Sequence, residues 1–196
     1  QAISTKKGNL SPYLLLSAIQ MQKNDYDGAL QTLQAAYKID SNNPEVLYQL
    51  GLVFYNKNDN KAYEYFEKVY MQYRQKHKEI PAKYIKAFII TAQYYYTTKQ
   101  YSKVVELTTI VPENLRDESL SLNYARSLYM LAQYNEAIVH FNKFRLSDND
   151  LFILCKCYAF INDTSKVKEI LSSNYYNTNF INKVKEDKLL KSIYTE

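Results

Sequence analysis

The side chains best suited to metal or acid–base chemistry are few in this chain, which holds two histidines in 196 residues. His140 has a carboxylate at helical spacing, Glu136, four residues before it. A lone His–Glu pair supplies too few ligands for a zinc site, so we expect a surface contact there. His77 lies within the charged run of residues 74–79, where a solvated helix end is expected.

The two cysteines, Cys155 and Cys157, are the only thiols. Side chains two residues apart on a helix point in different directions, so these thiols are not expected to bond to each other. Their spacing does not match a zinc-ligand motif either. We therefore interpret both as small packing residues, and they leave the redox compartment open.

Motifs for nucleophilic or phosphate chemistry are absent from the sequence. Its three glycines are isolated, which excludes a nucleophile elbow, a P-loop and a dinucleotide-binding loop. The Asp and Glu residues show no spacing that singles out an acid–base pair. The sequence therefore predicts a protein that is not an enzyme, with no catalytic residue, no cofactor and no metal site.

Composition then indicates what scaffold is present. Hydrophobic residues make up 46% and charged residues 23%, with only 3 Gly and 4 Pro, a balance that favours a globular protein of long helices over an all-β fold. No run of about eighteen apolar residues predicts a membrane span. The net charge of +5 is spread among interleaved acids and bases, so nucleic acid is not an expected partner. The chain starts at Gln1 rather than Met, which indicates a processed or excised piece whose compartment is unknown.

A short internal motif recurs along the chain and organises it. The stretch at residues 24–30, Asn-Asp-Tyr-Asp-Gly-Ala-Leu, returns at residues 99–105 and 132–138, with weaker copies at 58–63 and 162–167. Each copy lies between two apolar-periodic segments of about fourteen residues. Five pairs of helices joined by short polar turns are therefore predicted.

This pattern resembles the tetratricopeptide repeat, whose signature is a large residue, Leu-Gly, an aromatic, Ala and a second aromatic. The best match in residues 44–66 comprises Leu47, Leu50, Gly51, Phe54, Ala62 and Phe66. The resemblance implies an all-α, right-handed superhelical solenoid of about five antiparallel helix pairs, formed by residues 1–196 as a single unit. Its repeats would cover residues 10–43, 44–84, 85–117, 118–147 and 148–175, followed by a capping helix over 177–194.

Small residues recur where the two helices of a pair should lie closest. They are Ser17, Gly51, Ala92, Ala125 and Cys155 on first helices, and Ala29, Ala62 and Ala137 on second helices. We expect all of them to be buried. The second and third repeats start 41 residues apart, at Pro44 and Ile85, rather than about 34. Either the second helix of repeat two runs on toward Lys76, or the next helix starts near Pro81.

What the resemblance implies about function is a protein–protein interaction module, because first helices in this family line a concave face on which partner peptides lie. Register and charge assign to that face Tyr48, Leu52, Tyr55, Lys86, Ile89, Gln93, Tyr96, Arg126, Tyr129, Phe152 and Lys156. The expected partner is a protein or peptide that is apolar or aromatic, with acidic residues opposite Arg126, Lys156 and Lys86. Replacing Tyr55 and Tyr96 by Ala should weaken binding at least about tenfold.

Three alternatives limit this interpretation. Aromatic residues at helical spacing also occur as core, so each tyrosine can serve packing instead of recognition. The Lys and Asn pairs that hold a terminal carboxylate in some members are replaced here by Leu14, Ala18, Tyr48 and Leu52, so that clamp is not expected. The chain can also be a structural subunit of a larger, for example cell-envelope, complex, contacting partners by its ends or convex face, or a regulatory domain of a longer protein.

Overall fold

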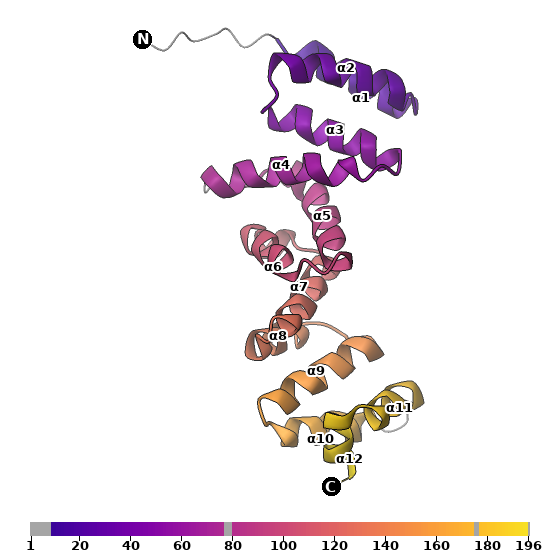
Figure 1. The fold of residues 1–196 in the computed structure, drawn as a ribbon, viewed down its shortest axis with the longest axis vertical. Helices are drawn as coiled ribbons and strands as arrows, with labels where there is room; N and C mark the ends of the chain where they lie inside the picture. The colour runs from indigo at the N-terminus through magenta and orange to yellow at the C-terminus, as the bar shows by residue number, and fades with distance from the viewer. Residues whose placement is uncertain (1–8, 77–79, 175–176, 196) are drawn as a thin grey trace. The chain divides into compact units, whose positions relative to one another are not determined.

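A computed structural model describes residues 9–76, 80–174 and 177–195 (Figure 1). Within these residues the secondary structure is entirely helical, which confirms the predicted all-α class. His77 lies outside the described residues. The α-helices are Ser11–Gln22 (α1), Tyr26–Ile39 (α2), Pro44–Asn56 (α3), Lys61–Lys76 (α4), Ile85–Thr97 (α5), Tyr101–Ile110 (α6), Glu118–Met130 (α7), Tyr134–Phe141 (α8), Asp148–Phe160 (α9), Thr164–Ser173 (α10), Thr178–Glu186 (α11) and Lys188–Thr195 (α12), with 3-10 turns at Ala82–Tyr84 (η1) and Glu113–Leu115 (η2).

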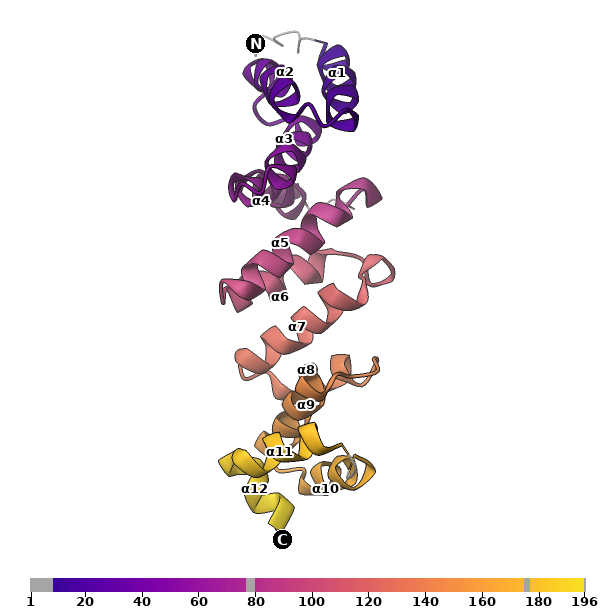
Figure 2. The ribbon, with the colours of Figure 1, turned by 90° about the vertical axis from the view of Figure 1, so that its right-hand side faces the viewer.

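The chain divides into two compact units, which are described separately. The first comprises residues 1–94 and 110–115. In it α1 packs against α2, α3 packs against α4, and both helices of the first pair contact α3 (Figures 1 and 2). One part of its core consists of Ala29, Leu33, Ala36, Val46, Leu50 and Val53. This pairing of consecutive helices is the hairpin architecture that the internal repeat predicts.

The second unit comprises residues 95–109 and 116–196. Here α7 packs against α8 and α9 against α10, and α9 also contacts α7, α8, α11 and α12 (Figure 2). Phe141, Leu128 and Leu154 lie in one core cluster, and Phe180 and Val184 in another that seats the C-terminal helices. The amphipathic α11 and α12 thus turn their apolar faces toward α9 and α10.

The predicted small contact positions are all buried. Ser17, Ala92, Ala125 and Cys155 on first helices and Ala29, Ala62 and Ala137 on second helices have exposures of 0–1%. Gly51 is buried too, and a Cβ built on it would lie 2.5 Å from Phe66 Cδ1 and 3.1 Å from Phe66 Cζ. Close approach of paired helices is therefore the physical reason for small residues at these positions.

Each helix pair reverses direction through the same left-handed turn. A residue with φ between 55° and 61° follows every first helix, and these residues are Asn24, Asn58, Lys99, Ala132 and Asn162. The next N–H in each case donates to a carbonyl five residues back, for example from Gln133 to Leu128 at 2.9 Å. This pattern is the Schellman motif, in which only Gly and Asn adopt the left-handed conformation readily.

Ala132 and Lys99 are the positions of this set at which the turn costs the most, because neither Ala nor Lys has glycine's freedom or asparagine's local hydrogen bonding. We expect Ala132→Asn to raise the free energy of unfolding by about 0.5–1 kcal/mol. Urea unfolding at neutral pH measures it. The reciprocal Asn162→Ala variant should lose a similar amount, and a gain in that variant would contradict the strain argument.

The extra length of the second repeat is taken up at its C-terminal end. Helix α4 continues to Lys76, and η1 leads directly into α5 at Ile85. Of the two placements that the sequence left open, the extension of α4 toward Lys76 occurs, whereas α5 itself does not start near Pro81. Tyr84, in η1, is 2% exposed, so the connection itself contributes to the core.

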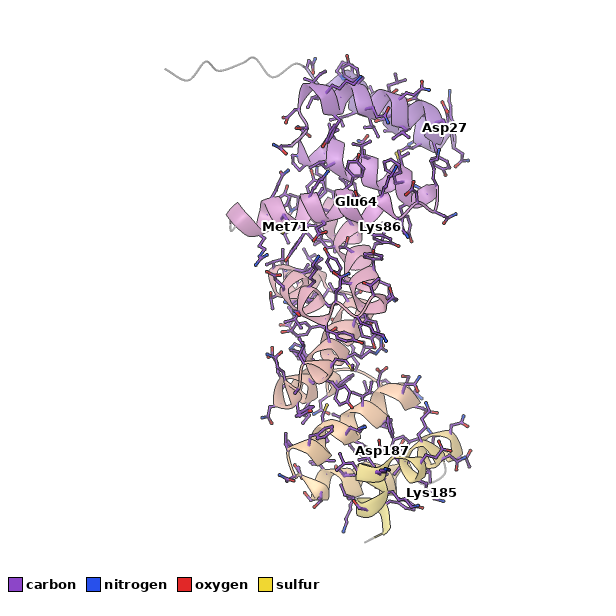
Figure 3. All side chains as sticks on the ribbon, in the orientation of Figure 1. Asp27, Glu64, Met71, Lys86, Lys185 and Asp187 are labelled. Atoms are coloured by element: carbon purple, nitrogen blue, oxygen red, sulfur yellow. The ribbon has the colours of Figure 1, made fainter. Side chains whose placement is uncertain are left out.

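The expectation of one capping helix over residues 177–194 is wrong, because two helices occupy this segment. The break occurs at Asp187, whose backbone is extended (φ −81°, ψ 125°). Its Oδ1 accepts the N–H groups of Leu189 and Leu190 at 3.0 and 3.1 Å, and its Oδ2 accepts from Lys156 Nζ at 2.9 Å. Asp187 therefore starts α12 and ties it to α9 (Figure 3).

Candidate partner-binding surface

Six predicted partner-binding residues lie in the first unit, on α3 and α5. Leu52 and Ile89 are half-buried, Gln93 is exposed, and Lys86 is exposed with no ion pair among the described residues (Figure 3). Tyr55 is 41% exposed at the C-terminal end of α3. This unit therefore offers a mixed surface with one large aromatic group open to solvent.

Tyr48 differs from its neighbours because its ring is engaged in packing. It lies 5.1 Å from the Tyr84 ring, edge to face, and 6.2 Å from the Phe66 ring. Burial, followed by the nearby Glu45 carboxylate, raises the pKa of the Tyr48 hydroxyl. Glu45 also accepts from the Tyr84 hydroxyl at 3.1 Å. At this position the packing alternative applies.

A pair of stacked tyrosines lies near Tyr55 in the same unit. The Tyr63 and Tyr94 rings are 3.9 Å apart and 9° from parallel. Burial raises the pKa of the Tyr63 hydroxyl, with smaller contributions from Tyr55 and Tyr94. The three hydroxyls are therefore close enough to influence each other, which places Tyr55 beside an aromatic pair.

The second unit contains a pocket of about 480 Å³ that joins three of the predicted residues. It is bounded by the end of α5, the middle of α7 and the start of α9. Its lining residues are Tyr96, Arg126, Ser147, Asn149, Asp150, Phe152 and Ile153. Three consecutive first helices thus contribute residues to one pocket.

The pocket contains a buried ion pair between Arg126 and Asp150. Arg126 Nε donates to Asp150 Oδ1 at 2.6 Å and Nη2 donates to Oδ2 at 2.8 Å, while Nη1 donates to Asn123 Oδ1 at 3.0 Å. The Asp150 side chain is 1% exposed and that of Arg126 is 26% exposed. Ser147 Oγ adds a further hydrogen bond to Asp150 Oδ2 at 2.7 Å. This bidentate geometry orients the guanidinium rigidly.

Electrostatics in the pocket follow from this pair. Burial alone raises the pKa of the Asp150 carboxyl, but the hydrogen bonds from Arg126 and Ser147 outweigh it, so the pKa lies below its usual value. Burial also raises the pKa of the Tyr96 hydroxyl, which Arg126 partly offsets. The Tyr96 hydroxyl has no hydrogen-bond partner among the described residues, and its ring lies 5.9 Å from that of Tyr101.

Lys156 on α9 is the second predicted cation of this unit, and it is also paired. Its Nζ donates to Asp187 and lies 5.7 and 5.9 Å from the ring centres of Phe152 and Phe160. Burial disfavours the ammonium, but the hydrogen bond to Asp187 prevails and the pKa of Lys156 is raised. Nearby, the rings of Tyr134 and Phe160 stack at 4.7 Å, and Tyr129 lies 6.0 Å from Tyr134.

These pairings bear on one sequence-based expectation, which stays a prediction. Arg126 and Lys156 were expected to favour acidic residues of a partner, yet each ammonium or guanidinium is neutralised by a carboxylate of the chain itself. Of the three predicted cations, Lys86 alone is exposed without such a carboxylate among the described residues. The two predicted cations of the second unit are therefore both paired with carboxylates of that unit.

Chemically reactive groups elsewhere are engaged in structure. Tyr124 donates to Glu136 at 2.7 Å and packs edge-on against His140 at 4.7 Å, so the His–Glu pair contacts a tyrosine of α7. Burial raises the pKa of each cysteine thiol to about 12, which keeps both protonated. The described part of the chain holds no group of three potential metal ligands and no helix long and apolar enough to cross a membrane.

Several residues of the pocket were not predicted as part of it. Ser147 and Asp150 show a helix-start signature in the sequence, Ser followed three residues later by an acid, and Ser147 indeed caps α9. That signature does not reveal that the Asp150 carboxylate also binds Arg126. Asn149 and Ile153 carry no sequence signal of a site.

Comparison with known proteins supports the same architecture. A family model described as "TPR repeat" matches residues 19–58. Among solved structures, YrrB, described as a TPR protein with an unusual peptide-binding site, has a TM-score of 0.62 at 18% identity, covering 100% of this chain and 96% of its own. MamA AMB-1 gives 0.59 at 16%, covering 83% and 88%. A tetratricopeptide repeat protein from Parabacteroides merdae gives 0.51 at 14%, covering 89% and 67%.

At these identities the solved structures establish the fold alone, and the family model adds the repeat itself. A search of curated protein sequences gave no match. Paired helices, buried small residues at the signature positions and a matched repeat in residues 19–58 agree with one another. Residues 19–58 carry a tetratricopeptide repeat, and the chain has the helical-repeat fold of tetratricopeptide repeat proteins.

Proposed function

We propose that this chain acts as an adaptor or assembly scaffold that binds an extended segment of a partner protein on the inner faces of its first helices. The observation that carries the proposal is the pocket of about 480 Å³ in the second unit, to which α5, α7 and α9 all contribute. Its size and its mixture of aromatic and polar lining fit a peptide side chain. YrrB, with a similar fold, is described as having a peptide-binding site, which supports the same class of function.

Tyr96 and Phe152 are the groups best placed to hold such a segment. Both are half-buried, so each ring is fixed on the pocket wall while part of it stays accessible. Aromatic anchors of this kind carry most of the binding energy in many interfaces because they bury a large area and have few rotors to immobilise. Tyr96 adds a hydroxyl that can bond to a peptide backbone.

Selection of a displayed peptide library on the immobilised protein tests this proposal. Tyr96→Ala and Phe152→Ala should each weaken the selected peptides at least about tenfold, measured by isothermal titration calorimetry. Lys168→Ala, an exposed change on α10, is the matched control and should leave the affinity unchanged. Failure to select any peptide, or equal binding to all three variants, would count against the pocket.

A second candidate function is a structural subunit that contacts partners through an end. Its support is α1, which carries no charged residue and has Leu15, Leu16 and Ile19 exposed by 66%, 49% and 41%. A helix that is apolar on all sides is normally covered on all sides. Photo-crosslinking distinguishes the two functions. A benzophenone amino acid at Ile153 should crosslink to a partner that binds in the pocket, and one at Leu16 should crosslink to a partner that binds at α1.

A further inference from the structure

The charged groups of the pocket are already paired with other groups of the protein. All three nitrogens of the Arg126 guanidinium donate to acceptors of the chain, two to Asp150 and one to Asn123. Both Asp150 oxygens in turn accept from Arg126 and one also accepts from Ser147. An acidic side chain of a partner would have to displace a bidentate carboxylate that is already fixed in place, which is unfavourable.

The same holds for the ammonium group on the next turn of α9. Lys156 Nζ is bound to Asp187, which also caps α12, so the carboxylate is held by three hydrogen bonds. Releasing Lys156 for a partner would leave Asp187 with an unpaired charge that is only 17% exposed. Neither cation is therefore available for recognising an anion without a cost to the fold.

What remains accessible in the pocket carries no unpaired charge. Phe152 and Ile153 supply apolar surface, and Tyr96 supplies a ring whose hydroxyl has no hydrogen-bond partner among the described residues. The Arg126 guanidinium is a flat group with one N–H of each nitrogen already engaged. Flat groups of this kind stack on aromatic rings. An uncharged aromatic side chain therefore matches the chemistry better than an acidic or a basic one.

We propose that the partner segment places an uncharged aromatic side chain in this pocket, between Tyr96, Arg126 and Phe152, and that the Arg126–Asp150 pair is a rigid wall rather than an anion site. This inference rests on the proposed peptide-binding function and specifies its partner. It predicts recognition by shape and apolar contact. Binding should consequently depend little on ionic strength, because no charge pair forms across the interface.

Two small probes distinguish the chemistries on the unmodified protein: N-acetyl-phenylalanine amide and N-acetyl-aspartate amide. Titration followed by ¹H–¹⁵N NMR should show the Phe probe shifting the Ile153 amide and the Arg126 Nε–H signals, with a Kd at least about fivefold below that of the Asp probe. Raising NaCl from 50 to 500 mM should change the Kd of the Phe probe less than about twofold. Preference for the Asp probe, or a tenfold loss in salt, would overturn the inference.

The Asp150→Asn variant tests whether the pocket gains affinity for an anion. It removes the carboxylate that neutralises Arg126, so the Asp probe should bind at least about fivefold tighter than to the native protein. Asp163→Asn, which alters an exposed cap of α10, is the matched control and should change neither affinity. If Asp150→Asn does not fold, the relative affinities of the two probes for the native chain decide the question by themselves.

The outcomes also separate this inference from the function on which it rests. If the Asp probe occupies the pocket more tightly, the pocket still binds peptide groups and only the aromatic specificity fails. If neither probe perturbs Ile153 or Arg126 and library selection yields no binder, the peptide-binding function fails together with the inference.

Discussion

Arg126→Ala is expected to lower the free energy of unfolding by about 3 kcal/mol, because it leaves the Asp150 carboxylate buried without its partner. The Asp150 side chain is 1% exposed in the native protein, so it depends on the guanidinium for most of its hydrogen bonding. Ser147 alone would still hydrogen-bond to the carboxylate. Urea unfolding at pH 7 measures the loss, with circular dichroism to show that the variant remains helical.

The penalty should depend on pH in a defined direction. The folded-state pKa of the Asp150 carboxyl lies below its unfolded value, so the stability from the ion pair is present above the unfolded pKa, about 3.9, and is lost as the pH falls through the folded pKa. The difference between native protein and Arg126→Ala should therefore shrink in acid. Replacing both partners, as Arg126→Met with Asp150→Leu, should recover most of the loss at pH 7. A loss under about 1 kcal/mol in the single variant would mean that the pair is solvated.

Gly51→Ala is expected to destabilise the protein by about 2 kcal/mol, although the same change in an exposed helix gains about 1 kcal/mol. The reason is steric. The new methyl group would lie 2.5 Å from Cδ1 of Phe66, a ring with 0% exposure that cannot move outward. Either α3 and α4 separate or the ring leaves its rotamer, and both disrupt close packing. Thermal and urea unfolding of the purified variant check the sign as well as the size.

A second-site change tests the cause of this effect. Phe66→Leu should cost about 1 kcal/mol alone through lost packing. Combined with Gly51→Ala, however, it makes room for the methyl group, so the double variant should be more stable than Gly51→Ala alone. If the two losses simply add, the clash with Phe66 is not what destabilises Gly51→Ala.

The helix pairs and their contact positions were predictable from the sequence because both depend on local, repeated patterns. Gly51, Ala92 and Ala125 recur at a fixed place in each first helix, and that place is buried wherever two helices cross closely. The left-handed turn residues recur in the same way. The repeat pattern therefore predicts the architecture without any knowledge of contacts between distant residues.

The electrostatics of the candidate site were not predictable, because they depend on pairings between distant residues. Asp150 lies 24 residues after Arg126, and Asp187 lies 31 residues after Lys156. The cap motif at Ser147 already accounts for Asp150 as a helix-start residue. It therefore gives no sign that Asp150 also forms an ion pair with Arg126. The break at Asp187 was missed for the same reason, since only its contact with α9 shows why the chain stops one helix and starts another there. Tyr48 likewise required its neighbours Tyr84 and Phe66 to be placed before packing could be distinguished from recognition.

The turn between the two helices of each pair contains no spare residue. Gln133, for instance, donates the last bond that closes α7 and is already the residue before α8 begins. One inserted residue would rotate the second helix by about 100° and turn its apolar side away from the first. We therefore expect inserted residues to be tolerated in the connections between pairs, such as the long one after α4, and not within a hairpin.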